Sequence, residues 1–476
     1  MRNLCRHNTT LLFLSSLLLG PSGPVLAQDL VIHGGFLFDA VSDDVRPNSG
    51  ILIRAGKLLA VDADLNSLEL GGIPILELSN NHYILPGFFD LHAHHAIDLF
   101  GQGRVDEQAA YPSIFLANGV TSVFPAGEMN PYQMRELRLA IERGERVGPR
   151  MFNSGPYFGS WRPGWDRNMT TDSIAREVDY WTSLGVQSFK AKGITPLHLQ
   201  ALIRRAHAHG ATVTGHLESG FRNTVNPRDA ILMGIDRIEH FLGGDAISDD
   251  RPAYSSLIEF DPDTPAFDSI AALYIRHGVF FDATLTAYGY YGERDPEVFD
   301  YFTDEKAFLT PYMRRIIDAR ELRAVNEQFE TIYWVKRRTI KAFYDAGGAH
   351  LITLGTDHPS WGEFFSGFSA HRELHTFVLA GIAPADAIRF ATINGARAMN
   401  VSSLLGTVEP GKLADLFVAE GNPLEDIRNT RNVVWVIKNG VQYDASLLLD
   451  GVRGRIGPAG PEEEPGWKPR RGAERD

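Results

Sequence analysis

The first part of the chain, residues 28–85, alternates short apolar runs with turns that contain glycine. Two of the runs stand at residues 30–32 and 51–53, and the pair Gly34-Gly35 marks a turn after the first. Brief apolar runs bounded by such turns are typical of β-strands. The pattern predicts a small β-structure here.

From residue 86 the pattern changes to an apolar or β-branched run, a polar loop and a helical stretch, repeated along the chain. This alternation is typical of parallel α/β folds, and eight repeats predict a (β/α)8 TIM barrel over residues 86–399. The predicted strands are residues 87–92, 120–125, 150–154, 186–192, 211–216, 236–240, 279–285 and 350–356.

Three further segments complete the predicted organisation. Residues 297–346 are rich in helical pattern and paired charges, and form an insertion that is either a lid or a surface decoration. Residues 400–447 return to short β-runs that end in the turn signal Asn439-Gly440, and we expect them to pair with residues 28–85 in one small β-sandwich domain. Residues 448–476 have too few apolar side chains to order themselves, so we expect a disordered tail.

Composition places the chain among globular proteins. Of its 476 residues, 44% are hydrophobic and 22% are charged, which excludes the disordered and fibrous classes. Its 46 Lys and Arg against 59 Asp and Glu give a net charge of −13, and no basic stripe interrupts this balance. Nucleic acid is therefore not an expected partner.

Residues 1–27 have the pattern of a secretory signal peptide. Two arginines lie in the first six residues, an apolar stretch follows at residues 11–19, and Val25-Leu26-Ala27 resembles a cleavage site. The apolar stretch is shorter than the roughly 20 residues that a membrane-spanning helix needs. We expect export to the periplasm or the medium, without a membrane anchor and without the one cysteine, Cys5.

Candidate metal ligands stand at the ends of the predicted strands. His92 and His94 are two apart on one strand, so both side chains point to the same face. His216, His240 and Asp357 each follow another apolar run. Because the carboxyl ends of barrel strands meet at one mouth, these groups are expected to converge and to bind metal.

A lysine belongs to the same set of strand ends. An ammonium beside a dication is unfavourable, but burial lowers the pKa of a lysine, and its neutral amine can add carbon dioxide to become an anionic carbamate. Lys190 and Lys192 lie on the same strand face and compete for this role. Lys190 is nearer the strand interior and is the first choice.

On these residues the chain resembles the amidohydrolase superfamily of metal-dependent hydrolases, in its imidazolonepropionase-like and Xaa-Pro-dipeptidase-like branch. The resemblance covers about residues 29–447. It rests on these motifs: Leu85 to His94, Phe189-Lys190, Ala206 to Gly210, Ile238-Glu239-His240, Gly355-Thr356-Asp357, Ala391 to Ala396 and Gly406 to Leu416.

The resemblance implies a (β/α)8 barrel flanked by a β-sandwich from both chain ends. It also implies two divalent metal ions, bridged by carbamylated Lys190, that activate a water for hydrolysis. Zinc fits imidazole and oxygen ligands best, and manganese, cobalt or iron fit the same set. Asp357 would take the proton of the water and pass it to the leaving amine. The implied ligands of the two ions are His92, His94 and Asp357 for the first, and His216 and His240 for the second.

The sequence departs from the dipeptidase-like pattern where substrate would bind. A Gly-Gly-His loop is replaced by an aromatic loop with Tyr157, Trp161 and Trp165, and Glu218 stands where members often have tyrosine. These residues, with His358 beside Asp357, are candidate substrate contacts. For the two tryptophans the alternative is that they only pin the loop.

Three functions remain open. The first is hydrolysis of an amide in a small or peptide-like substrate or in a cyclic amide. The second is phosphotriesterase or lactonase activity at the same metal pair. The third is a non-catalytic structural role, which the presence of all six ligands disfavours. A homo-oligomer is compatible with all three.

Overall fold

The computed structural model describes residues 28–67, 70–290, 295–301, 304–320, 325–358 and 362–469. The predicted signal peptide with Cys5, and residues 470–476 of the predicted tail, lie outside the described residues.

Each of the eight predicted strands is present. Their side chains are largely buried on both faces, as expected for parallel strands covered by helices. The strand predicted at residues 279–285 already ends at Asp282, because Thr284 adopts a left-handed backbone conformation with φ 50°. The strands are β6 (Phe88–Ala93), β9 (Val120–Pro125), β10 (Arg150–Met151), β11 (Ser188–Lys192), β12 (Thr212–His216), β13 (Arg237–Glu239), β14 (Phe280–Asp282) and β15 (Ile352–Thr353).

These strands form two parallel sheets, ordered β10-β9-β6 and β11-β12-β13-β14-β15. Backbone hydrogen bonds join the sheets at both seams. At one seam the carbonyl of Phe158, which follows β10, accepts a hydrogen bond from the N–H of Lys192. The N–H of Phe158 donates to the carbonyl of Lys190. At the other, the N–H of Leu91 in β6 donates to the carbonyl of Leu354, which follows β15. The strand ends therefore come together.

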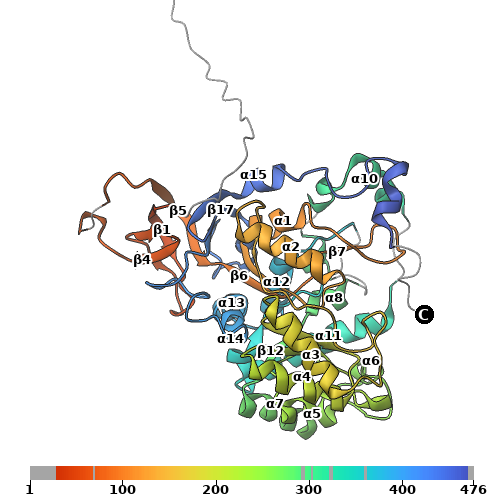
Figure 1. Cartoon of the computed structure of the whole chain (residues 1–476). Helices are drawn as coiled ribbons and strands as arrows, with labels where there is room; N and C mark the ends of the chain where they lie inside the picture. Colours follow the sequence, from red (N-terminus) through yellow and green to blue (C-terminus); the bar gives the residue numbers. More distant parts are fainter. Residues whose placement is uncertain are drawn as a thin grey trace, which may run out of the picture.

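Helices alternate with these strands and surround them (Figure 1). Several begin at a side-chain cap followed by proline at the first helical position, as at Thr195-Pro196 and Thr264-Pro265. The longer helices are α1 (Tyr111–Ala117), α2 (Pro131–Glu142), α3 (Thr171–Ser183), α4 (Pro196–Ala208), α5 (Pro227–Met233), α7 (Pro265–His277), α10 (Pro311–Asp318), α11 (Glu327–Asp345) and α12 (Ser369–Leu379). The shorter ones are α6 (Ala253–Leu257), α8 (Leu285–Gly289), α9 (Pro296–Phe299), α13 (Pro384–Arg389), α14 (Gly395–Ala398) and α15 (Ala445–Asp450).

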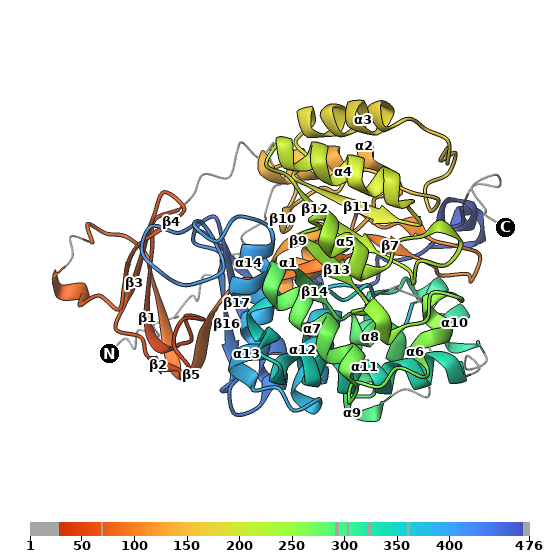
Figure 2. The same cartoon turned by 90° about the horizontal axis from the view of Figure 1, so that it is seen from below.

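Strands from both chain ends share one eight-stranded sheet, rather than two separately paired sheets (Figure 2). Antiparallel pairing of β5 with β16 joins the two ends. The Asn439-Gly440 pair makes the tight turn between β17 and β18, with positive φ at both residues, as the sequence predicted. The strands are β1 (Leu30–Leu37), β2 (Arg46–Pro47), β3 (Ile51–Arg54), β4 (Lys57–Val61), β5 (Ile75–Pro86), β16 (Leu416–Glu420), β17 (Val433–Lys438) and β18 (Val441–Asp444); a separate short pair is β7 (Ala96–Ile97) with β8 (Val105–Asp106).

The segment predicted as a helical insertion contains α10 and α11. Helix α11 is neither a surface decoration nor a loose lid, because Ile332, Tyr333, Ile340 and Phe343 on it are fully buried in the main core. Lys336 on the same helix is also buried. This helix therefore forms part of the wall behind the strand ends.

The prediction of a disordered tail is wrong for residues 448–469. Ile456 is fully buried, its N–H donates to the carbonyl of Phe308, and its own carbonyl accepts from Thr310. Trp467 packs against the main core. The segment has few apolar side chains, but these few are placed against α10 and the segment before it, which the overall composition could not reveal.

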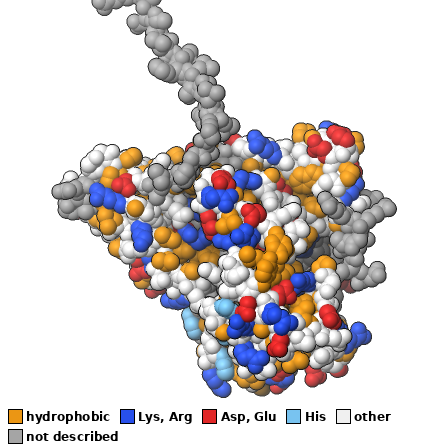
Figure 3. Space-filling model, in the orientation of Figure 1, with side chains coloured by type: hydrophobic (Ala, Val, Ile, Leu, Met, Phe, Trp, Pro, Cys, Tyr) orange, Lys and Arg blue, Asp and Glu red, His pale blue; other side chains and the backbone are white. Residues whose placement is uncertain are grey.

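The face shown in Figure 3 carries intermingled basic and acidic side chains. Among the described residues, no helix is both long enough and apolar enough to cross a lipid bilayer.

Candidate metal centre

Six side chains singled out in the sequence come from the ends of five strands at one end of the parallel sheets. His92 and Lys190 lie within β6 and β11, His216 ends β12, and His240 follows β13 directly. Asp357 follows β15 by four residues. Two of them, His240 and Asp357, have positive φ values of 74° and 42°, a conformation that costs energy for residues other than glycine. Such strain is typical of functional sites.

One group of donors contains His92, His94 and Asp357. Asp357 Oδ1 lies 2.7 Å from His94 Nε2 and 3.3 Å from His92 Nε2. One ligand atom from each residue lies within 4.8 Å of the others, close enough to hold a metal ion. Asp357 is the member with the most solvent access, 24% of its side chain, whereas both histidines are buried.

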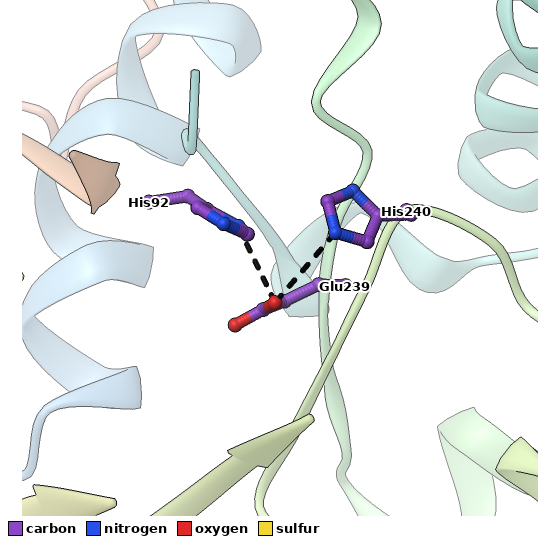
Figure 4. A group of neighbouring side chains, drawn as sticks. All are labelled: His92, Glu239 and His240. Atoms are coloured by element: carbon purple, nitrogen blue, oxygen red, sulfur yellow. Dashed lines mark ion pairs between the residues drawn. The ribbon is translucent and has the colours of Figure 1, made fainter. Parts of the chain in front are cut away.

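A second group contains His92, Glu239 and His240, again with ligand atoms within 4.8 Å of one another. Glu239 Oε2 lies between the two imidazoles, 3.4 Å from His92 Nδ1 and 3.8 Å from His240 Nε2 (Figure 4). His240 Nε2 is buried and has no hydrogen-bond partner among the described residues. A buried imidazole nitrogen left in this way fits a bound cation.

His216 lies beside this group without being a member of either. Its ring centroid is 4.1 Å from that of His240, and its Nε2 lies 3.2 Å from the hydroxyl of Tyr254. The sequence predicted His216 as a ligand of the second ion. In the structure its ring packs against the ring of His240, but it belongs to neither group of donors.

Lys190 is buried at the centre of the site. Its amine contacts the carboxylate of Glu239, and both side chains are almost completely shielded from solvent. Burial is the main reason why the pKa of Lys190 falls well below its ordinary value, and the charge of Lys192 adds to the effect. The amine is therefore held in an environment that disfavours its protonated form.

Lys192 has a different environment. Its side chain is half-buried, and its ammonium lies 3.6 Å above the ring of Trp161. In the pairing of β11 with β12, Lys190 lies opposite Thr214 and Lys192 opposite His216. The structure thus separates two lysines that periodicity alone could not.

Glu239 is the functional residue that sequence reasoning missed. Its Oε1 accepts a hydrogen bond of 2.9 Å from the hydroxyl of Thr214, and its Oε2 faces Lys190. The available signal was a carboxylate within the fully buried three-residue strand β13, beside the more conspicuous His240.

Comparison with known proteins identifies the family of the chain. The model of the family described as "Amidohydrolase family" matches residues 83–442. The chain belongs to the amidohydrolase family. No curated protein matches the sequence.

Solved structures resemble this amidohydrolase over most of its length. A Xaa-Pro dipeptidase with bound methionine is 22% identical, with a TM-score of 0.66 over 88% of this chain and 100% of its own. A putative prolidase from Bifidobacterium longum is 22% identical, with a TM-score of 0.64 over 90% and 99%. Molinate hydrolase is 18% identical, with a TM-score of 0.63 over 88% and 96%. At these identities the likeness shows a shared TIM-barrel-like α/β fold.

Two tyrosines of the amidohydrolase face the second group of donors. The hydroxyl of Tyr254, on α6, lies 3.0 Å from the hydroxyl of Tyr288, on α8. Glu218 accepts the N–H of Ala253 at 3.3 Å and so anchors the start of α6. The residue predicted as a direct substrate contact therefore positions the helix that carries Tyr254.

The buried amine of Lys336, on α11, supports the same wall. Lys336 Nζ lies 3.7 Å from the ring centre of Tyr288 and 3.3 Å from Thr284 Oγ1. Thr284 Oγ1 in turn lies 2.8 Å from Nδ1 of His240. This contact orients the His240 ring so that Nε2 faces the other donors.

The remaining predicted substrate contacts divide into two kinds. Trp165 packs edge-on against Phe158 and His198 and pins the loop, and His358 is fully buried between the rings of Tyr290 and Phe364. Tyr157 lines a cavity next to His94, and Trp161 is 49% exposed. Tyr157 and Trp161 are therefore placed where a substrate could reach them.

Proposed function

We propose that the protein is a binuclear metal-dependent hydrolase that cleaves a C–N amide bond in a small or peptide-like substrate or in a cyclic amide. The observation that carries the proposal is the convergence of four histidines, Lys190 and Asp357 at one end of the parallel strands. Membership of the amidohydrolase family supports hydrolysis as the reaction. We further propose that the two parallel sheets act as one closed (β/α)8 barrel with the eight-stranded sheet as an accessory domain, and that the protein is exported.

The donor set fits two divalent ions. His92, His94 and Asp357 would hold one, and His216 and His240 the other, with zinc the best match to imidazole and oxygen donors. When bound, two such ions lower the pKa of a water and polarise the carbonyl of the scissile amide. The proposal keeps His216 as a ligand of the second ion, although His216 belongs to neither of the two groups of donors.

Lys190 would supply the bridge between the two ions. Its neutral amine would add to the carbon of carbon dioxide and release one proton to water, which gives a carbamate with one negative charge and one remaining N–H. Glu239 already contacts this nitrogen and would accept the remaining N–H. Lys192 is held over Trp161 and stays an ammonium.

Asp357 would serve in proton transfer, and Tyr254 in binding the carbonyl of the substrate. Burial raises the pKa of Asp357, but His92, His94 and His240 outweigh burial and hold the pKa well below its ordinary value. A carboxylate with solvent access can take a proton from the attacking water and release it to the leaving nitrogen. The hydroxyl of Tyr254, beside His216, would donate to the carbonyl oxygen as negative charge develops there.

The reaction itself is tested by a substrate screen. Protein reconstituted with zinc and bicarbonate is assayed against dipeptides, N-acyl amino acids and cyclic amides, with lactones and phosphotriesters alongside. We expect turnover of an amide to exceed turnover of every ester and phosphotriester. Turnover of only a lactone or phosphotriester, or of nothing, would contradict the proposed reaction.

Metal content separates the two lysines. Lys190→Ala should lose the metal pair and the activity, because no bridge remains, and acetate or propionate should restore part of both. Lys192→Ala is the matched control: it should keep close to two ions per chain and change substrate affinity at most. Elemental analysis measures the outcome. If Lys192→Ala lost the metal pair and Lys190→Ala kept it, the bridge would be assigned to Lys192. Two metal ions per chain in both variants would exclude a lysine bridge.

Removal of the Tyr254 hydroxyl should affect chemistry rather than folding. Tyr254→Phe is expected to lower kcat by about 10²- to 10³-fold, the usual effect of removing one oxyanion donor, with unchanged metal content. Tyr274→Phe is the control, because Tyr274 is fully buried and its hydroxyl donates to the backbone carbonyl of Leu242 rather than to a group of the metal centre. Equal kcat values for the two variants would remove Tyr254 from the mechanism.

A further inference from the structure

A polar cavity lies beside the first group of donors, and the hydrolytic residues do not account for it. It encloses about 360 Å³, its opening to solvent included, and shares His94 with the candidate metal centre. Its other polar lining residues are His95, Arg104, Asp106, Glu128 and Tyr157. These side chains come from the segments that follow β6 and β9, from the short strand β8 with the residue before it, and from the loop after β10.

Arg104 supplies a positive charge to this cavity. It is half-buried just before β8, and in the described part of the chain its guanidinium makes no hydrogen bond or ion pair. Its charge contributes, after burial, to the lowered pKa of His94. Most arginines near the site are engaged elsewhere; Arg138, for example, donates to Asn153 and pairs with Glu142. A partnerless guanidinium beside a ligand cavity offers its planar pair of N–H groups to an incoming anion.

Glu128 supplies a second donor. The residue is 5% exposed, one carboxyl oxygen accepts from Asn153, and the other, Oε2, is buried with no hydrogen-bond partner among the described residues. Burial raises the pKa of Glu128 to about 8, so that the group is a neutral acid at pH 7 and carries an O–H. A buried carboxyl with one oxygen unsatisfied requires a polar partner from outside the chain.

The second carboxylate of the cavity does not compete for Arg104. Asp106 accepts a hydrogen bond from Asn130, and within the described ranges no ion pair joins it to an arginine. Burial raises its pKa as well, so the cavity disfavours further negative charge on its own walls. The combination of one guanidinium and one neutral acid favours an oxygen-rich anion over a cation.

We propose that this cavity binds a free carboxylate of the substrate, through Arg104 and Glu128. The inference rests on the proposed amide hydrolysis. Arg104 would pair with the carboxylate through two N–H groups, and Glu128 would donate its O–H to the same carboxylate. Because His94 borders both sites, a carboxylate held in the cavity places the adjacent amide nitrogen toward Asp357.

The test uses probes that bind without being cleaved. Twenty N-methylsulfonyl-L-amino acids and their primary amides are titrated into the zinc-loaded protein by calorimetry, since the sulfonamide bond replaces the scissile amide. We expect the best acid to bind about 10- to 100-fold more tightly than its amide, the range typical of hydrogen bonds to charged groups. In Arg104→Met this preference should fall to about threefold or less.

Two controls keep the test specific. Arg104→Lys retains the charge without the planar pair of donors and should keep a reduced preference, whereas Arg176→Met, at an exposed arginine of α3, should keep the full preference. The inference is overturned if no acid binds better than its amide in the unaltered protein, or if Arg104→Met retains the preference. Preference for acids without any amide turnover would instead overturn the proposed reaction and leave the carboxylate site standing.

Discussion

The candidate site depends on how the free-energy cost of burying the amine of Lys190 is offset. An ammonium shielded from water loses its hydration, and a single carboxylate neighbour repays that loss only in part. Glu239 provides this neighbour, and Thr214 holds Glu239 in place from the adjacent strand. Addition of carbon dioxide to the neutral amine would remove this cost, because the product is an anion that two metal ions could share. The rest of the site is arranged around that exchange.

The layers outside the donors hold them at fixed angles. Thr284 contacts His240 through Nδ1, Lys336 braces Thr284 and Tyr288, and Glu218 anchors the helix that presents Tyr254. Helix α11 therefore contributes to the site although it carries none of the proposed metal ligands. The cavity that His94 lines together with Arg104 and Glu128 would hold the part of the substrate that does not react.

Sequence patterns could predict the donors because each one ends an apolar run, and parallel strands bring those ends together. They could predict the eight strands and the Asn439-Gly440 turn for similar local reasons. They could not choose between Lys190 and Lys192, since both share a strand face, and only the burial of the first and the Trp161 contact of the second distinguish them. Tyr254 and Arg104 carry no motif, and contacts between distant segments decide their roles, as they decide the packing of Ile456.

Carbon-13 NMR of the zinc-loaded protein in labelled bicarbonate tests the central claim most directly. A carbamate carbon on Lys190 should give one resonance per chain, which disappears when Lys190 is replaced by alanine. A protein that binds two ions and turns over substrate without such a resonance, or that keeps the resonance in Lys190→Ala, would contradict the account.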